Sequence, residues 1–375
     1  MKFSIDQQVL NKALSFVSVA VPSKTTLHIL KGFLLDVSSD GKLTITASDR
    51  DLTIQKSLNT DYAEEGKIVV TAKLFSDIIR KLPAGSVTVS VDDSNNVISI
   101  KSNTGEFKIV GLQADDYPDI SDTNADDSSV QKVSINKEIF REMIRKTSFA
   151  ASSDDSKGVI VGTFLEAKEG CINMAALDGF RLAHAKEETS DNQEASIIVP
   201  ARTMAEIGRI MPESSEDEEK IDLVFDENKA VIRMEDSILI LRLLQGRFLN
   251  YRDLIPTNFN TRVTVDRLAL IDSLERTSLM VREGRNNLVR INVSGDIMKL
   301  SSDSDQGTVE EILPVSTTGD DIVIGFNSKY LLEGIKVFDE ESITLFITNA
   351  ISPCVIKADE ADGYTYMVLP VRIMV

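Results

Sequence analysis

The stretch FSIDQQVL, residues 3–10, has two near-copies further along the chain: VSINKEIF at residues 133–140 and VTVDRLAL at residues 263–270. In each copy apolar residues alternate as in a strand, an Asp or Asn follows, and the apolar spacing then becomes that of a helix. Asn136 lies 130 residues after Asp6, and Asp266 lies 130 residues after Asn136. These equal intervals indicate that one structural unit occurs three times.

Each repeat also has a second half, in which an apolar strand is followed by a short break and an amphipathic helix. These second halves read KIVVTAKLFSDIIRKLP from residue 67, SIIVPARTMAEIGRIMP from residue 196 and DIVIGFNSKYLLEGIKVF from residue 321. Between the helical segments, alternating apolar runs are broken by pairs such as Asn95-Asn96 and Glu169-Gly170, which is typical of hairpins. Each repeat is therefore predicted to be β-α-β-β-β followed by a second β-α-β-β-β.

This pattern favours an α+β fold with antiparallel sheets and helices gathered on one face. Hairpin connections are local, so a parallel, doubly wound sheet is disfavoured. Tyr and Pro lie close together in ADDYPDI at residues 114–120 and again in NYRDLIP at residues 250–256. We expect the domain joins to follow these stretches, giving three similar domains at residues 1–126, 127–256 and 257–375.

Length and composition agree with a large globular protein. The 375 residues suggest two or three domains, and a hydrophobic content of 42% allows a large core. Two cysteines, Cys171 and Cys354, cannot staple a chain of this size, which favours a reducing, cytoplasmic location. The N-terminus MKFSIDQQVL has no signal-peptide pattern, and no apolar run of about 18 residues exists, so no membrane partner is expected.

The net charge of −18 argues against nucleic-acid binding unless charge is segregated between faces. Acidic stretches are local and are typical of solvated loops, whereas cations recur on the predicted helices. They are Lys73 and Arg80, Arg141 and Arg145, Arg202 and Arg209, Arg267 and Arg276, and Lys329 and Lys336. Ion pairs within helices, for example to Asp77 or Glu206, explain part of this pattern. If these helices line one surface, that surface is basic. It would then suit contact with the phosphates of a nucleic acid without recognition of its bases.

Catalytic and metal-binding motifs are missing from the sequence. The two histidines, His28 and His184, lie in different repeats and have no metal-ligand spacing to a cysteine. Gly-rich phosphate loops and nucleophile elbows are absent, and the cysteines are interpreted as strand-buried fillers. We therefore expect no cofactor, no metal and no catalytic residue.

Five stretches, taken together, resemble the family of bacterial DNA polymerase III beta subunits, the beta sliding clamps, and the resemblance runs along the whole chain. They are MKFSIDQQVL at 1–10, LDGFRLA at 177–183, GRFLNYRDLIP at 246–256, IGFNSKYLLEGI at 324–335 and YMVLPVRIMV at 366–375. The resemblance implies a non-enzymatic, head-to-tail homodimeric ring, with helices lining the hole and sheets outside. Such a ring encircles double-stranded DNA without sequence specificity. An acidic exterior is tolerated because enclosure needs only weak attraction.

The resemblance also implies a peptide-binding pocket between the second and third domains. It would accept short linear motifs of the DNA polymerase III catalytic subunit, the clamp loader, other polymerases and repair proteins. By position, the pocket comprises Ile160, Leu177, Gly179, Phe180, Arg181, Leu182, Leu249, Leu254, Met367, Leu369, Pro370, Val371 and Arg372. Many members carry His at the position of Phe180 and Pro at that of Leu249, so the rim differs here.

Two further sets of residues follow from the resemblance. DNA contacts map to Lys24, Lys73, Arg80 and the loop SSDDSKG at 152–158, where Lys157 is the only cation. The dimer contact places Phe107 and Ile109 of the first domain against Leu279 and Met280 of the third domain. Some members have Arg at Thr104 and Glu106, facing acids at Glu310 and Glu311; those ion pairs cannot form as such here.

Two other functions remain open from the sequence. One is a transferase with its active site between domains, for which Arg181, Arg247 and Arg372 would supply converging cations. The other is an acidic scaffold that binds proteins but not DNA. Turnover of phosphorylated metabolites would favour the transferase, and function without DNA would favour the scaffold.

Overall fold

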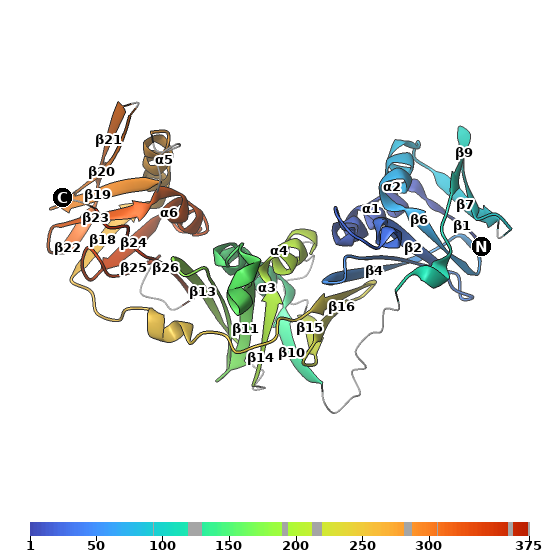
Figure 1. The fold of residues 1–375 in the computed structure, drawn as a ribbon, viewed down its shortest axis with the longest axis horizontal. Coiled ribbons are helices and arrows are strands. Elements are labelled where there is room, and N and C mark those ends of the chain that lie inside the picture. Colours follow the sequence, from blue (N-terminus) through green and yellow to red (C-terminus); the bar gives the residue numbers. More distant parts are fainter. Residues whose placement is uncertain are drawn as a thin grey trace. The chain divides into compact units, whose positions relative to one another are not determined.

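The computed structural model describes residues 1–92, 94–118, 130–189, 194–211, 220–280, 287–305, 307–358 and 363–373. The chain forms two compact units. Their helices and strands are labelled in Figure 1. Unit 1 contains Met1–Lys137 and Arg209–Leu243, and unit 2 contains Glu138–Gly208 and Leu244–Val375. The second repeat is therefore shared between the units. The expected domain join at 126/127 lies outside the described residues.

Six α-helices are found in the described parts of the chain, two in each predicted repeat. They are α1 (Gln7–Val17), α2 (Ala72–Lys81), α3 (Lys137–Thr147), α4 (Ala201–Ile210), α5 (Arg267–Ser278) and α6 (Ser328–Ile335). The predicted order of strands and helices is confirmed, with short additional strands in the first and third repeats. None of the helices in these ranges is long and apolar enough to cross a membrane.

Unit 1 contains two antiparallel sheets. The five-stranded sheet has the order β5 (Tyr62–Glu64), β1 (Lys2–Asp6), β7 (Ser86–Asp92), β8 (Val97–Ser102) and β9 (Gly105–Val110). The eight-stranded sheet has the order β10 (Gln131–Asn136), β15 (Lys220–Phe225), β16 (Lys229–Met234), β17 (Ser237–Arg242), β4 (Leu52–Asn59), β3 (Lys42–Ser48), β2 (Gly32–Val37) and β6 (Gly66–Thr71).

Unit 2 also contains two antiparallel sheets. The nine-stranded sheet has the order β14 (Ala195–Pro200), β11 (Gly162–Lys168), β12 (Cys171–Leu177), β13 (Arg181–Glu188), β26 (Tyr364–Val368), β25 (Cys354–Lys357), β24 (Ser342–Ile347), β18 (Thr261–Asp266) and β22 (Ser316–Gly319). The four-stranded sheet has the order β21 (Gly307–Pro314), β20 (Ile297–Ser304), β19 (Leu288–Ser294) and β23 (Ile322–Asn327).

The repeated Asp of the opening stretch has a local structural role. Asp6 is the N-cap of α1, where its carboxylate accepts hydrogen bonds from the backbone N–H groups of Gln8 and Val9 at 2.9 and 3.3 Å. Asp266 caps α5 in the same way through the N–H of Ala269 at 2.7 Å. A side chain that satisfies these otherwise unbonded N–H groups fixes the point where strand becomes helix.

The two large sheets each combine strands of two successive repeats. In unit 1 the last strand of the second repeat, β17, pairs with β4 of the first repeat, with Leu239 opposite Ile54. In unit 2 the last strand of the third repeat, β26, pairs with β13 of the second repeat, with Met367 opposite Leu182. The joins between repeats are thus continuous hydrogen-bonded ladders.

Helices cover one face of these sheets. Within unit 2, α5 and α6 pack against each other, and α6 lies on β26. A Cβ on Gly334 of α6 would collide with the ring of Tyr366, so only glycine allows this close approach. We call the face that carries Tyr366 the helix face of the nine-stranded sheet, and the opposite face the far face.

Candidate functional site

The far face of the nine-stranded sheet carries an apolar row across four strands. Side chains alternate between faces along a strand, so Leu182 and Met367 point away from α6, on which Tyr366 packs. The printed register places Leu177 opposite Leu182, Leu182 opposite Met367, and Met367 opposite Val355. These residues belong to one buried apolar cluster, defined by Ala175, Leu177, Leu182, Ile198, Phe248, Tyr251, Phe346, Val355 and Met367.

The chain segment between the second and third repeats covers part of this cluster. The N–H of Leu244 donates to the carbonyl of Ile198 at 2.8 Å, which attaches the segment to the edge strand β14. Phe248 stacks on Phe164 with ring centroids 4.9 Å apart. Tyr251 is buried against the cluster, and this burial raises its pKa to about 12.

Four large apolar side chains remain exposed in these same segments, and we call them the apolar rim. Phe180 is 55% exposed, Leu249 49%, Leu254 45% and Leu369 37%. The sequence assigned Leu177 and Leu182 to the pocket as well, but both are at most 2% exposed, so they form its buried floor.

The turn from β12 to β13 positions Phe180. The Asp178 carboxylate accepts hydrogen bonds from the N–H groups of Phe180 and Arg181 at 2.8 and 3.0 Å. Gly179 has a φ of 93°, which a residue with a side chain rarely adopts. The Phe180 ring stacks on the Tyr330 ring, with 6.3 Å between the centroids. The backbone carbonyl of Phe180 accepts a hydrogen bond from the N–H of Leu369 at 2.8 Å. Two members of the rim are therefore held together by backbone geometry.

Arg181 is internal and not a surface ligand. It is 8% exposed and forms ion pairs with Asp178 at 3.1 Å and with Glu333 of α6. Its guanidinium also donates to the Phe149 carbonyl at 3.0 Å and lies 4.6 Å from the Tyr330 ring centroid. These contacts join β13 to α6, so Arg181 holds together the elements beside the predicted pocket.

The remaining predicted pocket residues lie close to the same cluster. Ile160 is half-buried and packs against it. Pro370 and Val371 are half-buried, and the N–H of Val371 donates to the Gly325 carbonyl at 2.8 Å, whereas Arg372 is exposed. Sequence reasoning missed Phe248, Tyr251 and Val355. The aromatic residues in GRFLNY and the continuous apolar run in CVIK are the signals that could have identified them.

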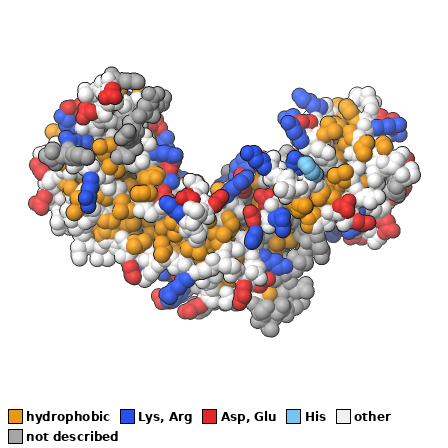
Figure 2. All heavy atoms as spheres, in the orientation of Figure 1, with side chains coloured by type: hydrophobic (Ala, Val, Ile, Leu, Met, Phe, Trp, Pro, Cys, Tyr) orange, Lys and Arg blue, Asp and Glu red, His pale blue; other side chains and the backbone are white. Residues whose placement is uncertain are grey.

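The predicted DNA-binding cations are exposed or half-buried, and several are already paired. Arg80 pairs with Asp77 at 2.5 Å and Arg141 with Glu138 at 3.0 Å. Lys24, Lys73, Arg202 and Arg209 are exposed. Lys157 lies over the Phe180 ring, 5.7 Å from its centroid, so this loop cation belongs to the surroundings of the apolar rim. Figure 2 shows Lys and Arg side chains interspersed with Asp and Glu on the face drawn.

Arg145 of α3 is paired with two carboxylates. It forms ion pairs of 2.5 Å with Glu142 and with Asp339, which follows α6. Burial alone would raise the pKa of the Glu142 carboxyl, but Arg145 and Lys146 together hold it below its ordinary value. Arg145 therefore contributes to stability within unit 2 in addition to any role toward DNA.

The predicted dimer residues lie at sheet edges or helix ends. In unit 1, β9 is an edge strand; Phe107 on it is exposed and Ile109 is half-buried. In unit 2, Leu279 and Met280 follow the last turn of α5 and are 54% and 36% exposed. In the last turn of the same helix, Arg276 forms an ion pair of 2.7 Å with Glu311 of the edge strand β21.

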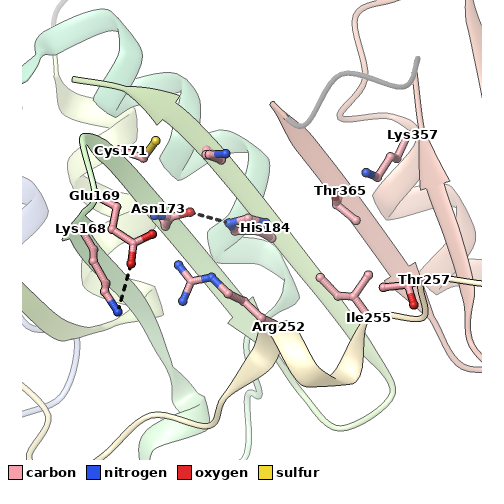
Figure 3. Close-up of a pocket in the computed structure, with 11 residues that line it drawn as sticks. Lys168, Glu169, Cys171, Asn173, His184, Arg252, Ile255, Thr257, Lys357 and Thr365 are labelled. Atoms are coloured by element: carbon pink, nitrogen blue, oxygen red, sulfur yellow. Dashed lines mark hydrogen bonds and ion pairs between the residues drawn. The ribbon is translucent and has the colours of Figure 1, made fainter. Parts of the chain in front are cut away.

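A hollow lies on the far face beside the apolar cluster (Figure 3). Its volume is about 520 Å³, and polar and cationic side chains line it. Sequence reasoning did not identify it, because its residues come from separate strands and a connecting segment. In the described ranges no group of three or more His, Cys, Asp or Glu side chains is placed to hold a metal ion.

Comparisons with known proteins agree along the whole chain. Three domain profiles match: the DNA polymerase III beta subunit N-terminal domain over residues 1–121, its central domain over 134–250 and its C-terminal domain over 252–372. The beta sliding clamp of Halalkalibacterium halodurans is 30% identical, with 99% of this chain and 100% of the relative aligned.

Solved structures of similar fold cover the full chain as well. A putative DNA polymerase III beta subunit from Eubacterium rectale has a TM-score of 0.92 at 29% identity, covering 99% of each chain. A sliding clamp from Pseudomonas aeruginosa, solved bound to griselimycin, has a TM-score of 0.92 at 25% identity, covering 100% of each chain.

Proposed function

The chain belongs to the DNA polymerase III beta subunit family, the beta sliding clamps, and we propose that two copies close head-to-tail into a ring around duplex DNA. The ring tethers the replicative polymerase and acts without catalysis of its own. It works in the cytoplasm, with the clamp loader, other polymerases and repair proteins as exchanging partners. The pairing rule of the sheets is the observation that carries this proposal.

The same pairing occurs at both joins within the chain. At each join, the last strand of one repeat pairs with the strand that ends the first half of the preceding repeat: β17 with β4, and β26 with β13. Applied once more, the rule requires a partner for β9, the last strand of the first repeat. It also requires one for β21, which ends the first half of the third repeat. Both are edge strands of their sheets.

These two edges have the chemistry of a strand-pairing interface. On β9, Phe107 is 44% and Val110 72% exposed, and on β21, Ile312 is 62% exposed. An edge strand with unpaired backbone groups and exposed apolar side chains is a template for another strand. Pairing β9 of one copy with β21 of a second copy satisfies both edges and extends both sheets.

The cations on the helices support a weak, non-specific contact with DNA. Lys73 and Arg80 on α2, and Arg202 and Arg209 on α4, are exposed while the whole chain carries a charge of −18. We place DNA on the helix side, with Lys24, Arg141, Arg145 and Lys157 as further candidates. Such contacts attract phosphate without fixing the position of the ring.

The apolar rim is the proposed docking site for partner peptides. A peptide that buries one Leu and one Phe there would gain about 1.5–3 kcal/mol for each side chain, part of which is lost to ordering. Affinity of that order permits exchange of partners while the ring stays on DNA.

The transferase alternative loses one of its three cations. Arg181 is engaged by Asp178, Glu333 and the Phe149 carbonyl, and removing it from these contacts would leave the buried Asp178 carboxylate without its cation. It is therefore not available to bind a substrate phosphate. The family is that of a non-catalytic processivity factor, and we propose the same for this chain.

Primer extension tests the function and the docking site together. With its cognate polymerase and loader on a long primed template, the wild-type protein should extend product length by an order of magnitude or more. Leu369→Asp should lose this stimulation, because it places a charge in the apolar rim. Tyr62→Asp, which changes an exposed aromatic residue on the edge strand β5 of unit 1, is the matched control and should behave as wild type.

The outcomes separate the two claims. No stimulation by the wild-type protein would contradict the proposed function. Full stimulation by Leu369→Asp would retain the function and remove the rim as the docking site.

A further inference from the structure

The hollow shown in Figure 3 continues the apolar row along the same strands. On β13, Leu182 of the row is followed two residues later by His184 and then by Lys186, all on the far face. On β26, Thr365 lies two residues before Met367 and opposite His184. The far face thus changes from apolar to polar and then to cationic over two steps along β13, and from apolar to polar along β26.

The hollow and the cluster also share a wall. Ile255 packs against the apolar cluster and lines the hollow, and the neighbouring Arg252 lines the hollow from the same segment. Tyr251 of the cluster lies 5.0 Å from the His184 ring, whose Nε2 is 3.0 Å from the Asn173 amide oxygen. Figure 3 shows Arg252 and Ile255 on one side of the hollow and Lys357 with Thr365 on another.

Cations dominate the lining of the hollow. Four line it, namely Lys168, Lys186, Arg252 and Lys357, against one carboxylate, Glu169. Glu169 is 3.6 Å from Lys168, and Arg252 pairs with Glu166 at 2.6 Å. In the described part of the chain Lys186 has no ion-pair partner. A positive hollow of this kind is unexpected on a chain whose net charge is −18.

We propose that this hollow binds carboxylate side chains of an acidic segment that directly flanks the hydrophobic motif of a partner protein. The inference rests on the proposed function, since the same peptide would first dock its apolar residues on the rim. Positive charge complements acidic side chains and speeds their encounter. Because the hollow and the apolar cluster share a wall at Ile255, the two sites adjoin and one peptide can occupy both.

Position argues for a protein carboxylate over a DNA phosphate. The hollow lies on the far face, whereas α6 covers the opposite face of the same sheet at Tyr366. Six of the cations proposed to contact DNA lie on α2, α3 and α4, and neither of the other two, Lys24 and Lys157, lines the hollow, so we place DNA on the helix side and away from it. We therefore assign an acidic peptide as the ligand of the hollow.

Calorimetry with matched peptides tests this directly. The core peptide is of the Gln-Leu-x-Leu-Phe type, and two longer versions carry Asp-Glu-Asp-Glu on its N-terminal or its C-terminal side. A further version carries Gln in place of each acid. Because the hollow adjoins the cluster on one side only, we expect one acidic version to bind about 3- to 10-fold tighter than the core peptide at low salt. The gain should decrease with added salt.

Two variants locate the gain. Lys186→Glu should abolish the advantage of the acidic flank and leave the affinity of the core peptide unchanged. Lys42→Glu, an exposed lysine on β3 of unit 1, makes the same charge change elsewhere and should keep the advantage. Equal affinity of the acidic and Gln-flanked peptides would overturn the inference while the proposed function stands. Failure of the core peptide itself would contradict the docking site and the inference together.

Cys171 provides an independent readout within the hollow. It lines the hollow and is partly exposed, whereas Cys354 is fully buried, so alkylation with iodoacetamide should report Cys171 alone. The acidic-flank peptide should slow this alkylation several-fold more than the Gln-flanked peptide. If short duplex DNA or inorganic phosphate protects Cys171 as well as the acidic peptide does, the hollow is a general anion site and our assignment is overturned.

Discussion

At the residue scale, Arg181 shows how a residue assigned to the pocket from a sequence motif can have a structural role inside the fold. The motif LDGFRLA placed it in the pocket, but the sequence contains no information on its burial. In the structure it joins β13 to α6 through Asp178 and Glu333. Leu177 and Leu182 behave similarly, since periodicity showed that they are apolar and only packing shows that they are the floor. The exposed rim could be recognised only after the covering segment had been placed.

We predict that Arg181→Met lowers the free energy of unfolding of unit 2 by about 3–5 kcal/mol, because a buried carboxylate loses its cation. The free energy of unfolding is measured by chemical denaturation and then, in a separate experiment, by calorimetry. Arg252→Met is the matched control: its ion pair with Glu166 is about half exposed on the Arg side, so the loss should be within about 1 kcal/mol. Equal losses in both variants would show that Arg181 contributes no more than a surface cation.

At the element scale, the sequence predicted the strands, hairpins and helices because each leaves a local period. It did not predict the pairing of β17 with β4 or of β26 with β13, because their partners lie far apart in sequence. Register between distant strands depends on which faces are buried together. The hollow was missed for the same reason, since it exists only once β12, β13, β25 and β26 lie side by side.

The ion pairs of α3 predict a pH dependence. The Glu142 carboxyl has a folded-state pKa below its ordinary value of 4.5, so it stabilises the fold above that pH. This stabilisation is lost as pH falls through the lower, folded-state pKa. Between about pH 5 and pH 3, the unfolding free energy should therefore fall less steeply in Arg145→Gln than in wild type, as measured by denaturation at each pH. Arg202→Gln, an exposed cation on α4, should keep the wild-type slope; an unchanged slope in Arg145→Gln would contradict this origin.

At the scale of the whole molecule, the account depends on closure between two copies. We predict a particle of twice 41.3 kDa in sedimentation experiments. Leu279→Lys should produce monomers, because it buries a charge where β9 and β21 meet. Leu268→Lys, at the other end of the same helix and 59% exposed, should remain dimeric. If Leu279→Lys is still dimeric at low micromolar concentration, the interface lies elsewhere.

The acidic charge of the chain is also explained at this scale. A protein of net charge −18 would bind DNA poorly by attraction alone. A closed ring needs little attraction, because DNA leaves it only through an end or an opening. The sequence indicated this through the cations on its helices, but composition alone pointed the other way.

Retention on DNA of two topologies tests the ring most directly. The protein is placed on a nicked circular plasmid by a clamp loader, the plasmid is then cut once, and the protein that remains bound is measured by gel filtration. We predict stable retention on the circle and rapid loss after linearisation, with the loss prevented when both ends are blocked by bound protein. Equal retention on circular and open linear DNA would contradict enclosure as the mechanism.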